Sequence, residues 1–185
     1  MLSARSGEQA ADRAAEFDEF FARKADSQLA RALGLAFYIT GDRHEAEDAT
    51  QEAMTRAWQA RGSLRDAGAF DAWIDRIVVN TCRERLRRGR RLRIVDIGSE
   101  PGIENRVAGA DGVDSLIARD AVERALATLP VDQRAAVVLR YWRDMTLEEI
   151  AEHLRWPIGT VKSRLHRALQ VLRDNLERDE TEVAP

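Results

Sequence analysis

The sequence predicts an all-α protein, made of two small helical domains joined by a flexible linker. Apolar residues recur with helical spacing along most of the 185 residues. One short stretch, LRIVDIG, has the pattern of a strand, but it stands alone, and an isolated strand has nothing to pair with. We expect a disordered N-terminus at 1–13, domains at 14–95 and 115–177, a linker at 96–114 and an acidic tail at 178–185.

The charge of the chain is unevenly distributed. The formal net charge is −3, yet the segment RERLRRGRRLR at 83–93 contains seven arginines and one glutamate. This asymmetry indicates a specific basic site on an otherwise acidic protein. The single cysteine, Cys82, excludes an internal disulfide, which is typical of a reducing compartment. No apolar run approaches a membrane span or the core of a signal peptide, so we expect a cytoplasmic protein without direct membrane insertion.

The first domain is expected to contain three helical regions. Residues 14–39 hold one or two helices and end at the turn signal TGD. A second helix at about 42–61 stops at Gly62, because glycine is favoured just past a helix C-terminus. After the loop GSLRDAG, a third helix covers roughly 69–91.

The second domain is expected to contain four helices. The segment at 98–114 holds four of the eleven glycines and has no apolar periodicity, so it is the best linker in the chain. The first helix beyond it covers about 115–128, and the second opens with Pro130 in its first turn. The third starts at the capping box Thr146-x-x-Glu149, and the fourth covers 157–177.

The last two helices have the pattern of a helix-turn-helix. The first has an apolar face, and a break at Arg155-Trp156-Pro157 separates it from the second. The second helix has a predicted buried stripe (Val161, Leu165, Ala168, Leu169, Leu172 and Leu176) and an opposite polar face (Thr160, Ser163, His166, Arg167 and Gln170, with Lys162 on the flank). Such a face suits the major groove of DNA. The alternative is a helical hairpin with a merely solvated outer face. The turn often needs a positive φ, which glycine adopts easily, at the position that Arg155 occupies. Arginine in this conformation should cost at most on the order of 1 kcal/mol.

The third helix of the first domain carries an arginine stripe, formed by Arg76, Asn80, Arg83, Arg87 and Arg90 at spacings of three and four residues. Guanidinium groups can hold phosphates and an amide can read a base edge, so this stripe suits nucleic acid. The alternative is a solvated charge run.

The helix before it, HEAEDATQEAMTRAW at 44–58, is acidic. Its alanines at 46, 49, 53 and 57 form a narrow seam for packing, and its other side carries an exposed polar face (Asp48, Gln51, Glu52, Thr55 and Gln59). DNA phosphates would repel these carboxylates, so this face should look away from DNA. It is either a plain solvent face or a docking surface for a basic protein helix.

These segments together resemble a sigma-70 family RNA polymerase sigma factor of the small extracytoplasmic-function (ECF) group. DRHEAEDATQEAMTRAW resembles region 2.2 of that family, and FDAWIDRIVVNTCRERLRR resembles regions 2.3 to 2.4. LPVDQRAAVVLRYWRDMTLEEIAEHLRWPIGTVKSRLHRAL resembles region 4. The resemblance spans about residues 16–176, with the motifs in the expected order.

The resemblance implies a sigma region 2 domain at 14–95, a region 4 domain at 115–177 and specific roles for their residues. Core RNA polymerase would bind through its β′ clamp helices and β flap, promoter DNA through −10 and −35 elements, and an anti-sigma factor would control activity. The implied polymerase contacts are Asp48, Gln51, Glu52 and Thr55. The implied −10 contacts are Ser63, Leu64, Arg65, Asp66, Arg76, Asn80, Arg83 and Arg87, and the implied −35 contacts are Thr160, Lys162, Ser163, His166 and Arg167. No catalytic residue, metal or cofactor is expected.

Other classes of protein fit less well. A stand-alone helix-turn-helix repressor or activator needs a dimer interface, and no unassigned apolar helix is available for one. A zinc hydrolase is disfavoured because His44-Glu45 lacks a second histidine four residues on. A calmodulin-binding or membrane-surface helix would explain 83–93 alone, but not the acidic helix or the second domain.

Overall fold

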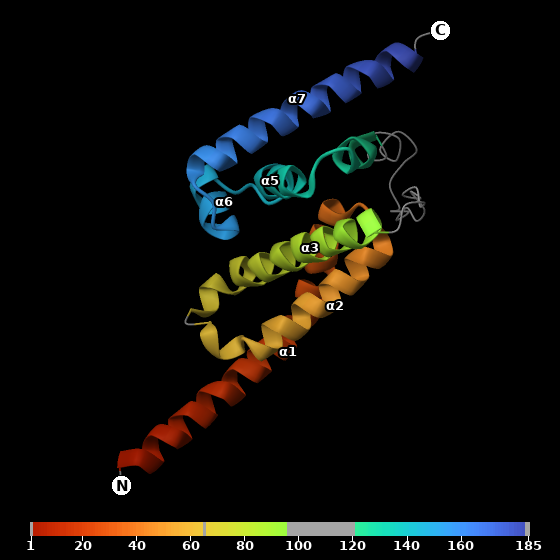
Figure 1. The fold of residues 1–185 in the computed structure, drawn as a ribbon. Coiled ribbons are helices and arrows are strands. Elements are labelled where there is room, and N and C mark those ends of the chain that lie inside the picture. The colour runs from red at the N-terminus through yellow and green to blue at the C-terminus, as the bar shows by residue number, and fades with distance from the viewer. Residues whose placement is uncertain (1, 65, 96–120, 184–185) are drawn as a thin grey trace.

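The protein is all-α, as the sequence predicts, and a computed structural model describes residues 2–64, 66–95 and 121–183. Within these ranges there is no β-strand. The helices in Figure 1 are α1 (Leu2–Thr40), α2 (Arg43–Gln59), α3 (Phe70–Val95), α5 (Val131–Tyr141), α6 (Leu147–Leu154) and α7 (Ile158–Val183), with 3₁₀ helices η1 (Arg61–Ser63) and η2 (Ala67–Ala69) and a helical segment at 121–127. The expected linker at 96–114 lies outside the described residues.

The two longest terminal helices extend further than the sequence analysis expects. Helix α1 begins at Leu2, so residues 2–13 are helical where disorder is expected. Alanine, the residue with the highest helix propensity, recurs through this stretch. Helix α7 runs to Val183, into the acidic tail.

The ends of the inner helices also differ from expectation. Helix α2 ends at Gln59 with Ala60 as its C-cap, before Gly62, because the chain tightens at once into the 3₁₀ turn of η1. Helix α3 continues to Val95, so the start of the strand-like stretch LRIVDIG is helical. Pro130 is the N-cap of α5 instead of lying in its first turn.

Helices α1, α2 and α3 form the N-terminal domain, and α2 packs on its neighbours through the predicted alanine seam. All four seam alanines are at most 1% exposed (Ala46, Ala49, Ala53 and Ala57). Gly41 has a φ of 72°, and the Asp42 carboxylate accepts a 2.8 Å bond from the amide of Glu45, which begins α2. Phe21 of α1 lies edge-on against Phe70 at 5.7 Å and against Trp58 at 5.6 Å.

The C-terminal domain contains the predicted helix pair. Thr146 and Glu149 form the predicted capping box at the start of α6. Arg155 follows α6 with a φ of 53°, the left-handed conformation that the turn was expected to require. Helix α7 then begins and buries Val161, Leu165 and Ala168 against the rest of the domain.

The two domains pack directly on each other and share one hydrophobic core, with α5 beside α1 and α3, and α6 beside α3 (Figure 1). The ring centroid of Trp142 lies 5.3 Å from that of Tyr38. The Trp142 ring packs closely on Gly34, where a Cβ would lie 3.2 Å from the ring. The buried guanidinium of Arg134 donates to the main-chain carbonyls of Ile39 and Thr40 at 3.1 and 3.0 Å. These contacts join the C-terminal end of α1 to α5.

Candidate polymerase and nucleic-acid interfaces

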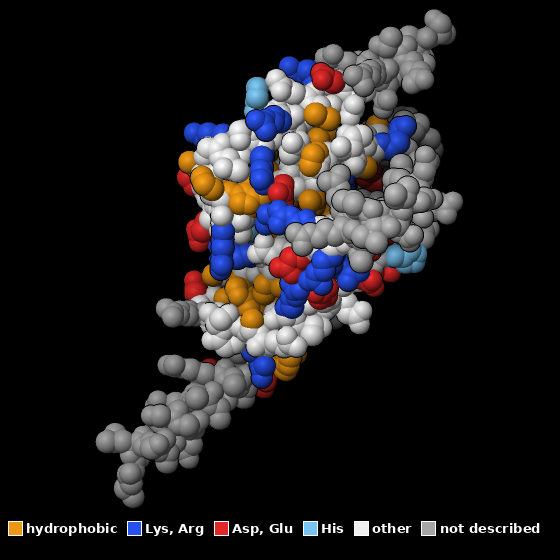
Figure 2. Space-filling view, viewed as in Figure 1, with side chains coloured by type: hydrophobic (Ala, Val, Ile, Leu, Met, Phe, Trp, Pro, Cys, Tyr) orange, Lys and Arg blue, Asp and Glu red, His pale blue; other side chains and the backbone are white. Residues whose placement is uncertain are grey.

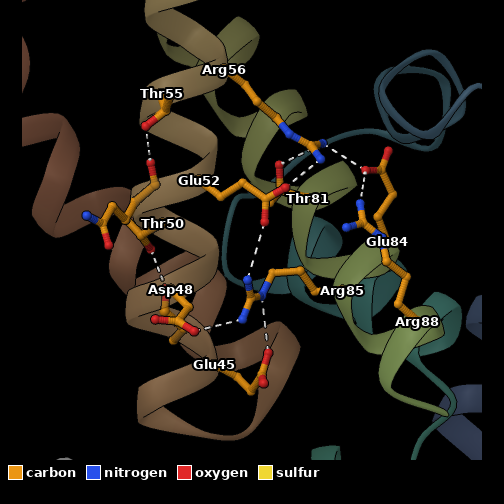
Figure 3. Close-up of polar contacts among 12 residues, drawn as sticks. Glu45, Asp48, Thr50, Glu52, Thr55, Arg56, Thr81, Glu84, Arg85 and Arg88 are labelled. Atoms are coloured by element: carbon orange, nitrogen blue, oxygen red, sulfur yellow. Dashed lines mark hydrogen bonds and ion pairs between the residues drawn. The ribbon is translucent and has the colours of Figure 1, made fainter. Parts of the chain in front are cut away.

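The carboxylates of α2 that face α3 are neutralised within the domain (Figure 3). Arg85 of α3 reaches Glu45 at 3.2 Å, Asp48 at 2.8 Å and Glu52 at 3.3 Å. Arg56 also bonds Glu52, at 2.6 Å. Asp48 keeps 63% of its side chain exposed, whereas Glu52 keeps 29%. The acidic side of α2 is therefore a fixed ion-pair network in which Asp48 remains the most accessible carboxylate.

The α1 side of α2 is different, because it borders an apolar hollow of about 570 Å³. Phe21, Leu29 and Leu33 of α1 line this apolar hollow, together with Glu47, Thr50, Gln51, Met54, Thr55 and Trp58 of α2. Leu29 and Trp58 are 48% and 42% exposed. Two of the predicted polymerase contacts, Gln51 and Thr55, thus lie at an apolar surface.

Sequence reasoning missed the apolar part of this surface. Met54 and Trp58 are four residues apart on α2, and Gln51 precedes Met54 by three, so the three share a helix side. That spacing could be read from the sequence. The contribution of α1 could not be predicted from the sequence, because it depends on how α1 and α2 pack.

Four members of the arginine stripe of α3, Arg76, Asn80, Arg83 and Arg87, lie on one side of the helix, as their spacing predicts, and this side faces the C-terminal domain. Arg83 donates to Asp132 of α5 at 2.9 Å and to Asn80 at 3.2 Å. Arg87 bonds Asp132 at 2.8 Å, and Arg76 lies 3.3 Å from Glu152 of α6. Figure 2 shows basic side chains along α3 with acidic side chains among them, many of them on the side toward α2. These four side chains lie together, but Arg83 is only 7% exposed.

The loop before α3 places its predicted −10 residues in different roles. Ser63 is exposed, and Leu64 packs against the core. Asp66 caps η2, since its carboxylate accepts a 2.8 Å bond from the amide of Gly68. Arg65 lies outside the described residues. Ser63 therefore offers an exposed hydroxyl in this loop.

The predicted reading face of α7 points to solvent. Lys162, Ser163, His166 and Arg167 are exposed and Thr160 is half-buried. One member of the predicted buried stripe, Leu169, is instead 39% exposed. Leu169 lies one residue beyond Ala168, at the edge of the packed side, where the C-terminal domain no longer covers the helix. Arg164, which the sequence analysis did not single out, points inward to Asp132 at 2.9 Å.

Comparison with known proteins places the chain in a family. The model of Sigma-70 region 2 matches residues 26–92, and that of Sigma-70 region 4 matches residues 119–172. The ECF RNA polymerase sigma factor SigM of Mycobacterium tuberculosis is 40% identical over 152 residues, which are 82% of this chain and 72% of that protein. The chain belongs to the ECF sigma factors.

Two further comparisons agree with this assignment. The ECF sigma factor SigE of Mycolicibacterium smegmatis is 35% identical over 184 residues, covering 97% of the present chain and 68% of SigE. Among solved structures, the sigma factor RpoE in complex with the anti-sigma factor NepR from Bartonella quintana matches with a TM-score of 0.71 and 26% identity. That match covers 86% of this ECF sigma factor and 98% of the RpoE chain.

Two negative observations complete the description of this ECF sigma factor. Among the residues that the structure describes, no three or more His, Cys, Asp or Glu side chains are placed to hold a metal ion. No helix in the same ranges has the length and apolar character that crossing a membrane requires.

Proposed function

We propose that this ECF sigma factor directs promoter-specific initiation by docking on the β′ clamp helices of core RNA polymerase with the α1–α2 side of its N-terminal domain, while α3 faces DNA. The observation that carries this proposal is the opposite chemistry of two neighbouring helices. Helix α2 offers the apolar hollow and the exposed carboxylate of Asp48, and α3 offers the arginine stripe. An amphipathic basic helix fits the first surface, and a phosphate backbone fits the second.

The −10 element would be held by the arginine stripe and the loop at 63–68. Asn80 supplies an amide for a base edge, Arg76, Arg83 and Arg87 supply charge for phosphates, and Ser63 is open to an unstacked base. The −35 element would be read by the exposed side of α7, through Thr160, Lys162, Ser163, His166 and Arg167. The β flap of the polymerase would hold the C-terminal domain at the correct distance.

Strand opening would need the polymerase as well. Opening ten base pairs costs on the order of 14 kcal/mol at about 1.4 kcal/mol per stacking step. Capture of one flipped base returns about 1–3 kcal/mol. The isolated sigma factor should therefore bind promoter DNA weakly and leave it closed.

We further propose an anti-sigma partner and action in the cytoplasm, where core polymerase is found. RpoE of Bartonella quintana, which this chain resembles in fold, was solved in complex with the anti-sigma factor NepR. A helical partner with apolar and basic residues would cover the apolar hollow and Asp48, and so exclude the polymerase. A complex that leaves this surface open to polymerase would contradict the proposal.

Run-off transcription on fragmented DNA of the source genome tests the sigma function. Core polymerase should give discrete new transcripts when the protein is added, and Thr55→Arg should abolish them, because a long cation at the edge of the apolar hollow blocks docking. Gln59→Arg, an equal charge change one turn further along α2 and outside the lining of the hollow, should reduce them much less. Absence of transcripts, with a two-fold symmetric footprint on DNA without polymerase, would instead support the stand-alone regulator.

A further inference from the structure

A single carboxylate of the C-terminal domain receives three arginines. Asp132, in the first turn of α5, bonds Arg83 Nε at 2.9 Å and Arg87 Nη2 at 2.8 Å from the N-terminal domain. Arg164 Nη1 of α7 reaches the same carboxylate at 2.9 Å. The Asp132 side chain is 19% exposed.

Trp156 extends this cluster. It stands in the turn between α6 and α7, and its ring lies 4.8 Å from the guanidinium carbon of Arg83 and 3.9 Å from that of Arg164. A guanidinium over an aromatic face is attracted by the ring and stacks on it. Arg83 is therefore held at its charged end by Asp132 and on its face by Trp156. We call these five residues the Asp132 cluster.

The surroundings show that the carboxylate is ionised in this cluster. Burial desolvates Asp132 and by itself would raise its pKa, but hydrogen bonds and charge from Arg83 and Arg87 outweigh burial, so the pKa is lowered. The N-terminal turn of α5 also favours a negative charge at this position. The cluster keeps an excess of positive charge, since one carboxylate faces three guanidinium groups.

Several arginines converging on one oxyanion is the arrangement with which proteins hold a phosphate. Two of these arginines, Arg83 and Arg87, belong to the stripe proposed for the −10 element. While Asp132 is in place, Arg83 is buried, and DNA cannot reach it without displacing α5. We propose that Asp132 acts as an internal substitute for a DNA phosphate, which holds the free sigma factor closed over its own −10 surface. This inference rests on the proposed −10 role of the stripe.

The consequence is a competition between α5 and DNA for the same guanidinium groups. In the free chain the contact is intramolecular and therefore acts at high effective concentration. When polymerase binds both domains and separates them, Arg83 and Arg87 are released together. Arg164 and Trp156 leave with the C-terminal domain.

Energy transfer between dyes on the two domains of the free, full-length protein tests the closed state. Cysteines introduced at Gln59 and Gln170, which are both exposed, would carry the dyes. Cys82 can stay, because it is fully buried and burial raises the pKa of its thiol to about 12. Asp132→Asn should lower the transfer efficiency, since it removes the charge and keeps the shape.

The matched control is Glu152→Gln. Glu152 pairs with Arg76 across the same domain boundary, but its side chain is 81% exposed, so losing its charge should leave the transfer efficiency unchanged. Arg164→Gln is a second test that does not alter α3, and it should also lower the efficiency. Unchanged efficiency in both Asp132→Asn and Arg164→Gln, with native circular dichroism, would overturn the proposal.

Binding of a fluorescent promoter-length duplex to the free protein separates this inference from the function on which it rests. Asp132→Asn should bind the duplex about tenfold more tightly than the wild type, because it removes the charge that competes with DNA for Arg83 and Arg87. Glu152→Gln should change the affinity much less than Asp132→Asn, because its ion pair with Arg76 is exposed. Lower transfer efficiency without tighter binding would uphold the internal contact and would refute the DNA role of Arg83 and Arg87.

Discussion

Arg143 of the C-terminal domain forms an ion pair with Asp75 of the N-terminal domain, and the two side chains are 10% and 6% exposed. Burial raises the pKa of the Asp75 carboxyl, although hydrogen bonding and charge from Arg143, and charge from Arg31, oppose that shift. Burying an ion pair costs solvation that pairing often does not return in full. We therefore expect the pair to fix how the domains meet more than to add stability.

Removal of one partner of this pair should be costly. Arg143→Ala should lower the free energy of unfolding by about 3 kcal/mol, because Asp75 stays buried without its nearest cation. Adding Asp75→Asn to Arg143→Ala should recover part of the loss. Urea unfolding followed by circular dichroism measures the unfolding free energies of the single and the double variant. A double variant no more stable than Arg143→Ala would show that Asp75 is not the source of the cost.

His153 should make stability fall in mild acid. The side chain is buried, and burial together with the charge of Arg76 lowers its pKa from 6.5 to about 4. Below pH 6.5 the unfolded chain takes up a proton that the folded protein refuses, so stability is lost as the pH falls from 6.5 to about 4. The total loss of unfolding free energy over this pH range is about 3 kcal/mol.

His153→Gln tests this dependence, because it removes the titrating group. The difference in unfolding free energy between wild type and variant should shrink or reverse toward pH 4. His166→Gln, the same substitution at an exposed position of α7, is the matched control. Parallel curves for all three proteins would mean that His153 titrates normally.

Arg155→Gly should stabilise the protein. Arg155 has a φ of 53° and an exposed side chain, and glycine adopts this conformation without the clash that a Cβ causes. The expected gain is at most about 1 kcal/mol, measured as a rise in melting temperature. Asp144→Gly is the comparison, with a φ of 52°. It should gain less, since aspartate tolerates this region better. A lower melting temperature for Arg155→Gly would reveal a stabilising role for the arginine side chain.

Arg85→Gln should destabilise the N-terminal domain through charge. It leaves Glu45, Asp48 and Glu52 to repel one another, with an expected loss of about 1 kcal/mol at low ionic strength that shrinks at high salt. Arg88→Gln is the control, because Arg88 pairs with Glu84 alone in the charge network of Figure 3 and is 61% exposed. Equal losses at both ionic strengths would point to packing instead of charge.

The features that sequence analysis predicted correctly depend on local spacing. The alanine seam of α2, the capping box at Thr146 and the left-handed Arg155 each follow from residues within one turn or one short segment. The all-α class follows from the same periodicity. These features need no knowledge of what a helix packs against.

The features that sequence analysis missed depend on which helices pack against each other. The neutralisation of α2 carboxylates by Arg85 requires the packing of α3 on α2, and the apolar hollow requires α1. Asp132 is an ordinary first-turn carboxylate in the sequence, and only the packing of the two domains places it among Arg83, Arg87 and Arg164. Leu169 shows the converse error, because periodicity assigned it to a packed side that the domain does not cover.

Phe21 contacts both the surface proposed to bind polymerase and the loop proposed to bind the −10 element. It lines the apolar hollow, and the same ring packs edge-on against Phe70, the residue at which the loop gives way to α3. When two ligands bind at sites that are coupled through a shared side chain, each changes the affinity of the other by the same factor. If an occupant of the hollow favours one arrangement of the loop, DNA held by that arrangement favours the occupant to the same degree. Polymerase at the hollow and promoter DNA at the loop would then each strengthen the binding of the other to this protein.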